Sequence, residues 1–295
     1  MSRVLTAMPA VVLALAVLAG CGQEPTPGAP SAEKAPATAD SHAKRRQMEA
    51  MRADCMKGKG FKYIPNVSPD KIRKGRLMEL SGDYEAMHEY REKHGFGVYF
   101  AWAYPDDPDE GIPKTLPDPN MKLAESFSEA QYEAWDAADN ACLATVFKKL
   151  TGKTIASRDD LYEQAENLYI KARERELDGD ARLVELARGF GDCLKSKGYP
   201  VNSLKPTALQ TNVRDRFEKE RTEAQKKRME SGAMEKPGGL RMPPNEARPR
   251  LAKEIKAALD DLECGKDFYA EFLPRDMKLR DKAWNEFGQK DGLIP

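Results

Sequence analysis

The residues with the clearest potential for covalent chemistry are four of the five cysteines: Cys55, Cys142, Cys193 and Cys264. An even number of cysteines is what a disulfide framework requires in an exported protein. No two of the four are separated by only two to four residues, which is the spacing that common zinc sites use. The chain also has only three histidines. We therefore expect two disulfides and no metal site.

Motifs for covalent catalysis are incomplete in this sequence. Residues 68–71 fit the S-x-x-K pattern of penicillin-binding enzymes, but neither S-D-N nor K-T-G accompanies them. Ser68 stands before a proline and is better explained as a helix cap. Residues 152–154 end like a phosphate-binding loop, yet Phe147 stands where that motif needs glycine. We therefore predict no catalytic residue and no cofactor.

Two other segments could bind a ligand. The acidic loop 106–111 could hold calcium, but Pro108 breaks the EF-hand spacing, and a solvated turn fits the loop better. Alternating apolar residues predict a short strand over residues 97–104. Its aromatic rings could form a platform for sugar rings or a partner protein, or could belong to the core. This candidate binding surface consists of Tyr99, Phe100, Trp102 and Tyr104.

The N-terminus has the pattern of an export signal. After the positive Arg3, residues 4–18 are almost wholly apolar, and they are too few for a membrane span of about 20 residues. The tetrapeptide Leu18-Ala19-Gly20-Cys21 that follows resembles the lipobox of bacterial lipoproteins. The resemblance implies cleavage of a signal peptide comprising residues 1–20, a diacylglyceryl group on the Cys21 sulfur, and acylation, for instance by palmitate, of the new amino terminus. Secretory cleavage after residues 14–16 and an uncleaved anchor are the alternatives.

Residues 21–44 are predicted to form the lipidated cysteine and a disordered tether. From Gly22 onward this segment is rich in Pro, Ala, Ser and Thr and has no aromatic or large aliphatic residue, so it cannot bury enough surface to order itself. The whole chain has 48 basic and 48 acidic residues, and loss of Arg3 with the signal leaves a formal charge of −1. A neutral balance argues against nucleic acid and against electrostatic membrane binding. Attachment to the membrane would therefore come from the acyl chains on Cys21.

An internal duplication organises the rest of the chain. Residues 54–61 (DCMKGKGF) match residues 192–199 (DCLKSKGY) at five of eight positions. A weaker pair is Asp139 with Cys142 against Asp261 with Cys264, in which the same two residue types keep the same spacing. The motifs alternate along the chain, which predicts a first half over residues 45–156 and a second half over residues 157–295.

The spacing of apolar residues places each cysteine on a helix. Gly60 and Gly198 supply helix ends, and Ser128 with Gln131 forms a capping-box pattern at the start of another helix. Residues 250–272 read as the fourth cysteine helix, although Cys264 lies opposite its apolar stripe, so we expect a bend or an end there. The mixed charge run 214–230 reads as a solvated helix, with a partner-binding arm as the alternative. We therefore predict a mostly α fold with two pseudo-repeated helical halves.

Four cysteines allow three disulfide pairings. If each repeat carries its own bond between its first and last helix, the pairs are Cys55 with Cys142 and Cys193 with Cys264. Each half would then be stapled by one disulfide.

Several short motifs of the first half together resemble a family of secreted, mostly lipid-anchored proteins of actinobacteria. The motifs are the segments 55–65, 95–98 and 117–120, and Ser128-Glu129 followed by Tyr132, Trp135 and Cys142. The similarity is clearest over residues 50–145, and the family has no assigned activity. It therefore implies location and architecture only.

The sequence as a whole favours a lipid-anchored binding or interaction protein on the extracytoplasmic face of the cell membrane. Its partner would be another envelope protein or a glycan. The alternatives are an envelope hydrolase that uses carboxylates among the 48 acidic residues and a structural spacer. A cleft in which acidic side chains converge would favour the hydrolase, and an aromatic cleft, or none, would favour binding.

Overall fold

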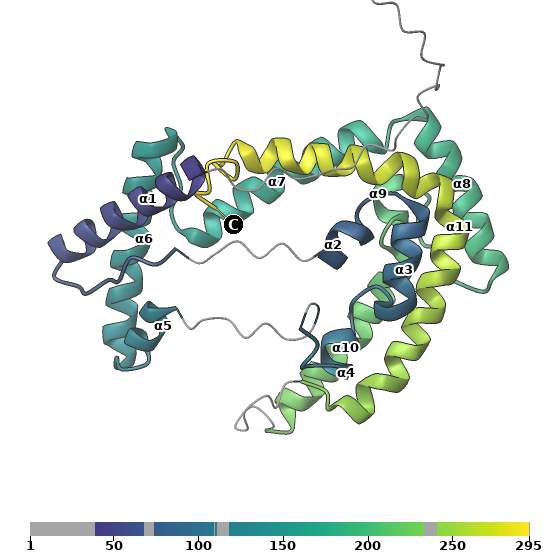
Figure 1. Ribbon diagram of the computed structural model, residues 1–295, viewed down its shortest axis with the longest axis horizontal. Coiled ribbons are helices and arrows are strands. Elements are labelled where there is room, and N and C mark those ends of the chain that lie inside the picture. Colours follow the sequence, from purple (N-terminus) through teal and green to yellow (C-terminus); the bar gives the residue numbers. More distant parts are fainter. Residues whose placement is uncertain (1–38, 68–73, 109, 111–117, 233–240, 295) are drawn as a thin grey trace, which may run out of the picture. The chain divides into compact units, whose positions relative to one another are not determined.

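The helices expected around the four cysteines are present in the computed structural model (Figure 1). The structure describes residues 39–67, 74–108, 110, 118–232 and 241–294, with side chains from Ala43 onward. In these ranges every regular element is a helix, so the prediction of a mostly α fold is confirmed. The helices are α1 (Ala39–Gly58), α2 (Lys74–Glu79), α3 (Tyr84–His94), α4 (Phe100–Ala103), α5 (Pro119–Ala124), α6 (Glu129–Thr151), α7 (Arg158–Leu177), α8 (Ala181–Ser196), α9 (Pro206–Leu209), α10 (Asn212–Glu230) and α11 (Pro244–Asn285).

The duplicated motif ends α1 and α8 in the same way. Gly60 and Gly198 both have a φ of 85°, in the left-handed region that favours glycine. The Phe61 N–H donates to the carbonyl of Met56 at 2.9 Å, and the Tyr199 N–H donates to the carbonyl of Leu194 at 2.9 Å. These are the hydrogen bonds of a Schellman turn, so the sequence repeat is also a repeat of local structure.

Local capping signals place the other long helices where the sequence predicts them. At α6 the Ser128 hydroxyl accepts from the Gln131 N–H, and the Gln131 side chain accepts from the Ser128 N–H, which completes a capping box. Ser157 caps α7. Gly152 has a φ of 76° and its N–H donates to the Lys148 carbonyl at 2.8 Å, so Gly152 caps the C-terminus of α6 and residues 153–154 follow the helix.

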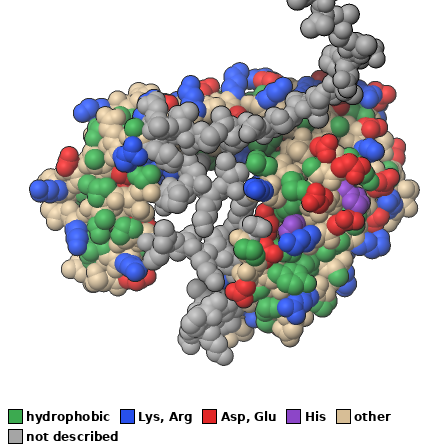
Figure 2. Space-filling view, viewed as in Figure 1, with side chains coloured by type: hydrophobic (Ala, Val, Ile, Leu, Met, Phe, Trp, Pro, Cys, Tyr) green, Lys and Arg blue, Asp and Glu red, His purple; other side chains and the backbone are tan. Residues whose placement is uncertain are grey.

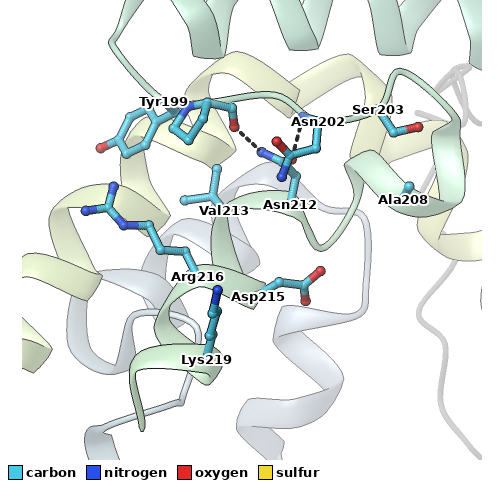
Figure 3. A pocket seen from close by; sticks show the side chains of 10 residues that line it. Tyr199, Asn202, Ser203, Ala208, Asn212, Val213, Asp215, Arg216 and Lys219 are labelled. Carbon is cyan, nitrogen blue, oxygen red and sulfur yellow. Dashed lines mark hydrogen bonds between the residues drawn. The ribbon is translucent and has the colours of Figure 1, made fainter. Parts of the chain in front are cut away.

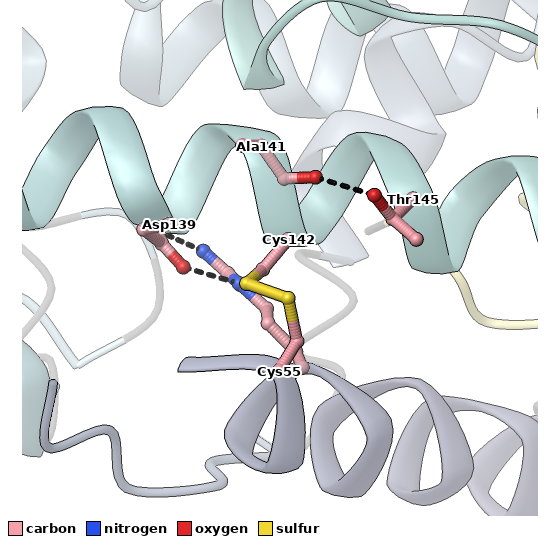
Figure 4. Close-up of a disulfide and its surroundings, with 6 residues drawn as sticks. Cys55, Asp139, Ala141, Cys142 and Thr145 are labelled. Atoms are coloured by element: carbon pink, nitrogen blue, oxygen red, sulfur yellow. Dashed lines mark hydrogen bonds and ion pairs between the residues drawn. A yellow bond between two sulfur atoms is a disulfide. The ribbon is translucent and has the colours of Figure 1, made fainter. Parts of the chain in front are cut away.

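Both predicted disulfides are present. Cys55 on α1 bonds to Cys142 on α6, with 5.7 Å between their Cα atoms (Figure 4). Cys193 on α8 bonds to Cys264 on α11, with a corresponding Cα distance of 5.5 Å. Each bond joins a helix of the first motif to a helix of the second, as the repeat argument predicts.

Among the described residues, which belong to one compact unit, the buried hydrophobic side chains gather in three clusters. The largest joins α3, the segment 96–100 and helices α8 to α11. A second joins α1, α6 and α7 to the C-terminal residues, and a small third surrounds the Cys55–Cys142 bond. Helices of both sequence halves contribute to the first two clusters, so the duplication is seen in the helix ends and disulfides, while the packing combines the halves.

The expected strand over residues 97–104 is wrong, because the segment contains the helical turn α4. Gly95 and Gly97, with φ values of 62° and 81°, turn the chain directly after α3. The Glu254 carboxylate of α11 then accepts the N–H groups of Val98 and Tyr99 at 2.8 and 2.9 Å. The amides that begin the turn are thus paired without a neighbouring strand.

Helix boundaries differ from expectation at both ends of the chain. Helix α1 begins at Ala39, before the expected start of the first half at residue 45, and Lys44 reaches Asp291 near the C-terminus at 2.9 Å. Helix α11 continues past Cys264 to Asn285 instead of ending there, and its ribbon curves strongly along its length in Figure 1. Within the described part of the chain, no helix is both long enough and apolar enough to span a bilayer.

Candidate functional site

A surface cavity of about 390 Å³ lies between α10 and the loop that follows α8 (Figure 3). We call it the α10 pocket. The chain reaches it directly after the Schellman turn at Gly198, and α9 supplies one side. It is lined by Tyr199, Pro200, Asn202, Ser203, Ala208, Asn212, Val213, Asp215, Arg216 and Lys219.

The walls of the α10 pocket are fixed by hydrogen bonds. The Asn212 amide donates to the Pro200 carbonyl at 2.8 Å and accepts from the Asn202 N–H at 3.3 Å, so one side chain clamps the loop to α10 (Figure 3). The Tyr199 hydroxyl donates to Asp260 of α11 at 2.8 Å. Burial and this contact raise the pKa of the Tyr199 phenol, so it remains a neutral donor. The pocket therefore exists before any ligand arrives.

The charges of the pocket differ in how fully they are paired. Asp215 accepts from the Thr211 hydroxyl at 2.8 Å, and Arg216 lies 3.5 Å from Glu220. Lys219 makes no hydrogen bond or ion pair with another described residue. Val213, which is buried, supplies an apolar floor. The pocket can therefore hold a small apolar group and pair an attached negative charge with Lys219.

The predicted aromatic surface is divided between the core and the exterior. Tyr99 has 0% of its surface exposed, and Phe100 is also buried. Trp102 is half-buried, and Tyr104 is 46% exposed. The guanidinium groups of α10 and α11 cover the two outer rings, with Arg221 5.8 Å from the Trp102 centroid and Arg248 5.4 Å from the Tyr104 centroid. The four rings therefore do not share one face, and Tyr104 is the part open to a partner.

Two buried arginines, Arg91 and Arg52, form ion pairs with carboxylates, and the sequence did not predict these pairs. Arg91 of α3 donates to Glu79 at 2.9 Å and to Asp261 at 2.8 Å. Arg52 of α1 donates in the same way to Asp139 of α6 and lies 3.3 Å from Glu49. Asp139 and Asp261 each stand three residues before a disulfide cysteine; the sequence repeat marks these two aspartates but not their arginine partners. These carboxylates neutralise buried guanidinium groups.

Glu254 is another buried carboxylate, and its environment predicts a pH effect on stability. Its side chain is 0% exposed, and burial raises its pKa to about 7, against the opposing effect of the N–H groups of Val98 and Tyr99. In the unfolded chain the pKa is 4.5. Between pH 4.5 and about pH 7, Glu254 is protonated in the folded state and ionised in the unfolded state. The free energy of unfolding therefore falls as the pH rises through this range, by up to about 3 kcal/mol in total.

The substitution Glu254→Gln tests this effect. Glutamine does not titrate, so we expect urea unfolding to show a smaller loss of stability from pH 5 to pH 8 in the variant than in the unsubstituted protein. It offers one acceptor oxygen for two N–H groups, so stability at pH 5 should also fall, by about 1–3 kcal/mol. The matched control is Glu133→Gln, at an exposed position of α6. An unchanged pH dependence in Glu254→Gln would contradict the assignment.

The remaining predicted sites differ in what the structure says of them. Cys21 and Ser68 lie outside the described residues, as do parts of the acidic loop 106–111. In the described part of this loop, Asp107 accepts from the Glu110 N–H at 2.9 Å. The part of the chain that is described contains no group of three or more His, Cys, Asp or Glu placed to hold a metal ion. On the face shown in Figure 2, acidic and basic side chains lie intermingled over α3 and α8.

Fold and site thus define a helical body with two disulfides, two buried arginine–carboxylate clusters and a preformed surface pocket. No protein-family model, curated protein or solved structure matches this chain.

Proposed function

We propose that this protein is a lipid-anchored binding protein on the extracytoplasmic face of a bacterial cell membrane, and that the α10 pocket is its binding site. The lipobox pattern Leu18-Ala19-Gly20-Cys21 supports the anchor. The two disulfides are consistent with an oxidising compartment outside the cytoplasm.

The observation that carries the binding proposal is the form of the α10 pocket. Its loop wall is clamped by Asn212, its floor is apolar at Val213, and Lys219 makes no ion pair with a described residue. A preformed concave site with an apolar base and a few placed polar groups is the usual form of a ligand site. A ligand with a small apolar group beside a carboxylate or another anion would fit, as in the side chains or the C-terminus of a partner protein.

The buried carboxylates do not favour the rival hydrolase. Asp139 and Asp261 each accept hydrogen bonds from an arginine, and Glu254 accepts backbone N–H groups. A hydrolase acid or base must reach a substrate proton, and these groups face the interior. Binding therefore remains the better reading of the geometry.

The binding proposal is tested by photo-crosslinking in intact cells. A photoreactive amino acid replaces Ala208, an exposed residue that lines the pocket. The matched control carries it at Ala134, an exposed residue of α6 outside the pocket. We expect a discrete crosslinked product when the photoreactive residue is at position 208 and none when it is at position 134. Lys219→Glu should lower the yield of the product at position 208 about tenfold, because loss of one ion pair worth about 1.4 kcal/mol weakens binding by that factor. Equal products at both positions, or none at 208, would remove the pocket as the binding site.

The anchor has its own test. Cys21→Ser removes the only thiol to which the lipid could attach under this proposal, so the protein should move from the membrane fraction to the soluble extracytoplasmic fraction. Mass spectrometry of the unsubstituted protein should find an acylated peptide that begins at Cys21. A mature chain with another start, or without lipid, would overturn the anchor and leave the pocket test unaffected.

A further inference from the structure

A second surface cavity, of about 360 Å³, opens between α8 and α11 and reaches the Cys193–Cys264 disulfide. Cys264 is part of its lining, and Phe190 and Phe268 supply buried rings beside it. The charged residues around it carry both signs. The lining consists of Arg182, Glu185, Leu186, Gly189, Phe190, Glu263, Cys264, Lys266, Asp267 and Phe268.

The position of Cys264 on α11 explains why this residue borders a cavity. It lies about 200° around the helix from Leu262, which belongs to the buried stripe. The next residue, Gly265, packs so closely that a Cβ there would stand 3.0 Å from the Phe190 ring. At Gly189, in contrast, an added Cβ would meet no atom within 4 Å. Open space over Gly189 thus gives access to the α8–α11 crossing.

The other disulfide has a different environment. Cys142 is 0% exposed and packs in a cluster with Met56 and Trp135. Its partner Cys55 is half-buried, whereas Cys193 and Cys264 are both half-buried and neither is fully enclosed. The same chain therefore contains one bond with a fully enclosed cysteine and one bond with two partly accessible cysteines, of which one lines a cavity.

We propose that Cys193–Cys264 is a thiol–disulfide exchange site whose co-reactant is a dithiol protein that approaches through this cavity. A thiolate of the dithiol attacks the Cys264 sulfur, forms a mixed disulfide and breaks the bond to Cys193, which leaves as a thiolate and takes up a proton. The second thiolate of the dithiol then attacks its own partner sulfur and releases Cys264. Two electrons pass to this protein, and the dithiol becomes a disulfide. The site is independent of the α10 pocket and of the anchor.

Exchange at this bond leaves the packing of α8 on α11 in place. Leu183, Ala187 and Leu194 of α8 are completely buried, and the Phe190 ring lies 5.3 Å from Phe268 and 5.5 Å from Tyr269. The reduced protein should therefore remain folded. The reduced Cys193 lies at the end of α8, just before the turn that leads to Tyr199 and the α10 pocket.

The test compares the two bonds within one folded chain. The full-length mature protein is treated with reduced thioredoxin as the dithiol probe, the free thiols are alkylated at intervals, and peptides are mapped by mass spectrometry. Because access governs exchange, we expect alkylation of Cys193 and Cys264 about tenfold faster than that of Cys55 and Cys142. Equal rates, or faster opening of Cys55–Cys142, would overturn the proposal.

A cavity variant tests the route of approach. Gly189→Leu fills the open space on α8 and, since Gly189 lies within a helix, does not weaken the local helix propensity. We expect it to slow alkylation of Cys193 and Cys264 several-fold and to leave the rate at Cys55 unchanged. Ala181→Leu, at an exposed position of the same helix that does not line the cavity, is the matched control. An unchanged rate in Gly189→Leu would show that the dithiol does not use this cavity and would contradict the proposed site.

Discussion

Replacing Arg91 with methionine is expected to lower the free energy of unfolding by about 3–5 kcal/mol, because removing one partner of a buried ion pair leaves the other charge uncompensated. The Arg91 side chain is 2% exposed. It donates to Glu79 at 2.9 Å, to Asp261 at 2.8 Å and to the Ala258 carbonyl at 3.0 Å, so it joins α2 and α3 to α11. Urea unfolding of the oxidised protein measures the loss.

The control for this prediction is Arg182→Met. Arg182 has 58% of its side chain exposed and, among the described residues, pairs only with the exposed Glu185, so stability should change by less than about 0.5 kcal/mol. A combined variant, Arg91→Met with Glu79→Gln and Asp261→Asn, removes the uncompensated charges and should recover part of the loss. A single Arg91→Met variant that loses less than about 1 kcal/mol would show that water or other groups neutralise the two carboxylates.

The helix ends and the disulfide pairing were predictable because they depend on residues close together in the sequence or on a repeat. Gly60 and Gly198 follow the same D-C-x-K pattern, and both end a helix with a left-handed residue. The condition that each repeat carries its own bond between its first and last helix also reduces three pairings to one. Information of this kind is present in a single sequence.

The turn at residues 97–104 could not be predicted because its conformation depends on a distant residue. Alternation of apolar residues around Phe100 and Trp102 is typical of a strand. Glu254, more than 150 residues away, provides the acceptor for the Val98 and Tyr99 N–H groups and makes a helical turn stable. No local pattern contains that contact.

The α10 pocket and the buried arginines were missed for the same reason. Asn212 closes the pocket by a hydrogen bond to Pro200, and neither residue forms part of a recognised motif. Arg91 and Asp261 are separated by 170 residues. The prediction that the charge run 214–230 forms a helix is confirmed. Arg216 and Lys219 of this helix line a pocket because α9 and the loop before it lie opposite them, and that position is not encoded in the charge run itself.

The second large prediction concerns removal of each disulfide by paired Cys→Ala substitutions. The bonds close separations of 87 and 71 residues. By loop-closure entropy, the loss of either should lower the free energy of unfolding by about 4 kcal/mol. Urea unfolding should therefore give similar values for Cys55→Ala/Cys142→Ala and for Cys193→Ala/Cys264→Ala.

The two variants should differ in local stability, because the clusters around the bonds differ in size. The cluster at Cys55–Cys142 has only four buried hydrophobic members, Met56, Trp135, Ala138 and Cys142, whereas α8 and α11 both belong to the largest cluster. Local opening free energies follow the amount of packing that holds a segment. Without the Cys55–Cys142 bond, amide hydrogen exchange in the last turns of α1 should thus become much faster. Without the Cys193–Cys264 bond, exchange in α8 should become faster only by the amount that the lower global free energy of unfolding accounts for. Equal local acceleration in the two helices would mean that packing does not hold α8 on α11 independently of the bond, and it would also count against a folded reduced state at Cys193–Cys264.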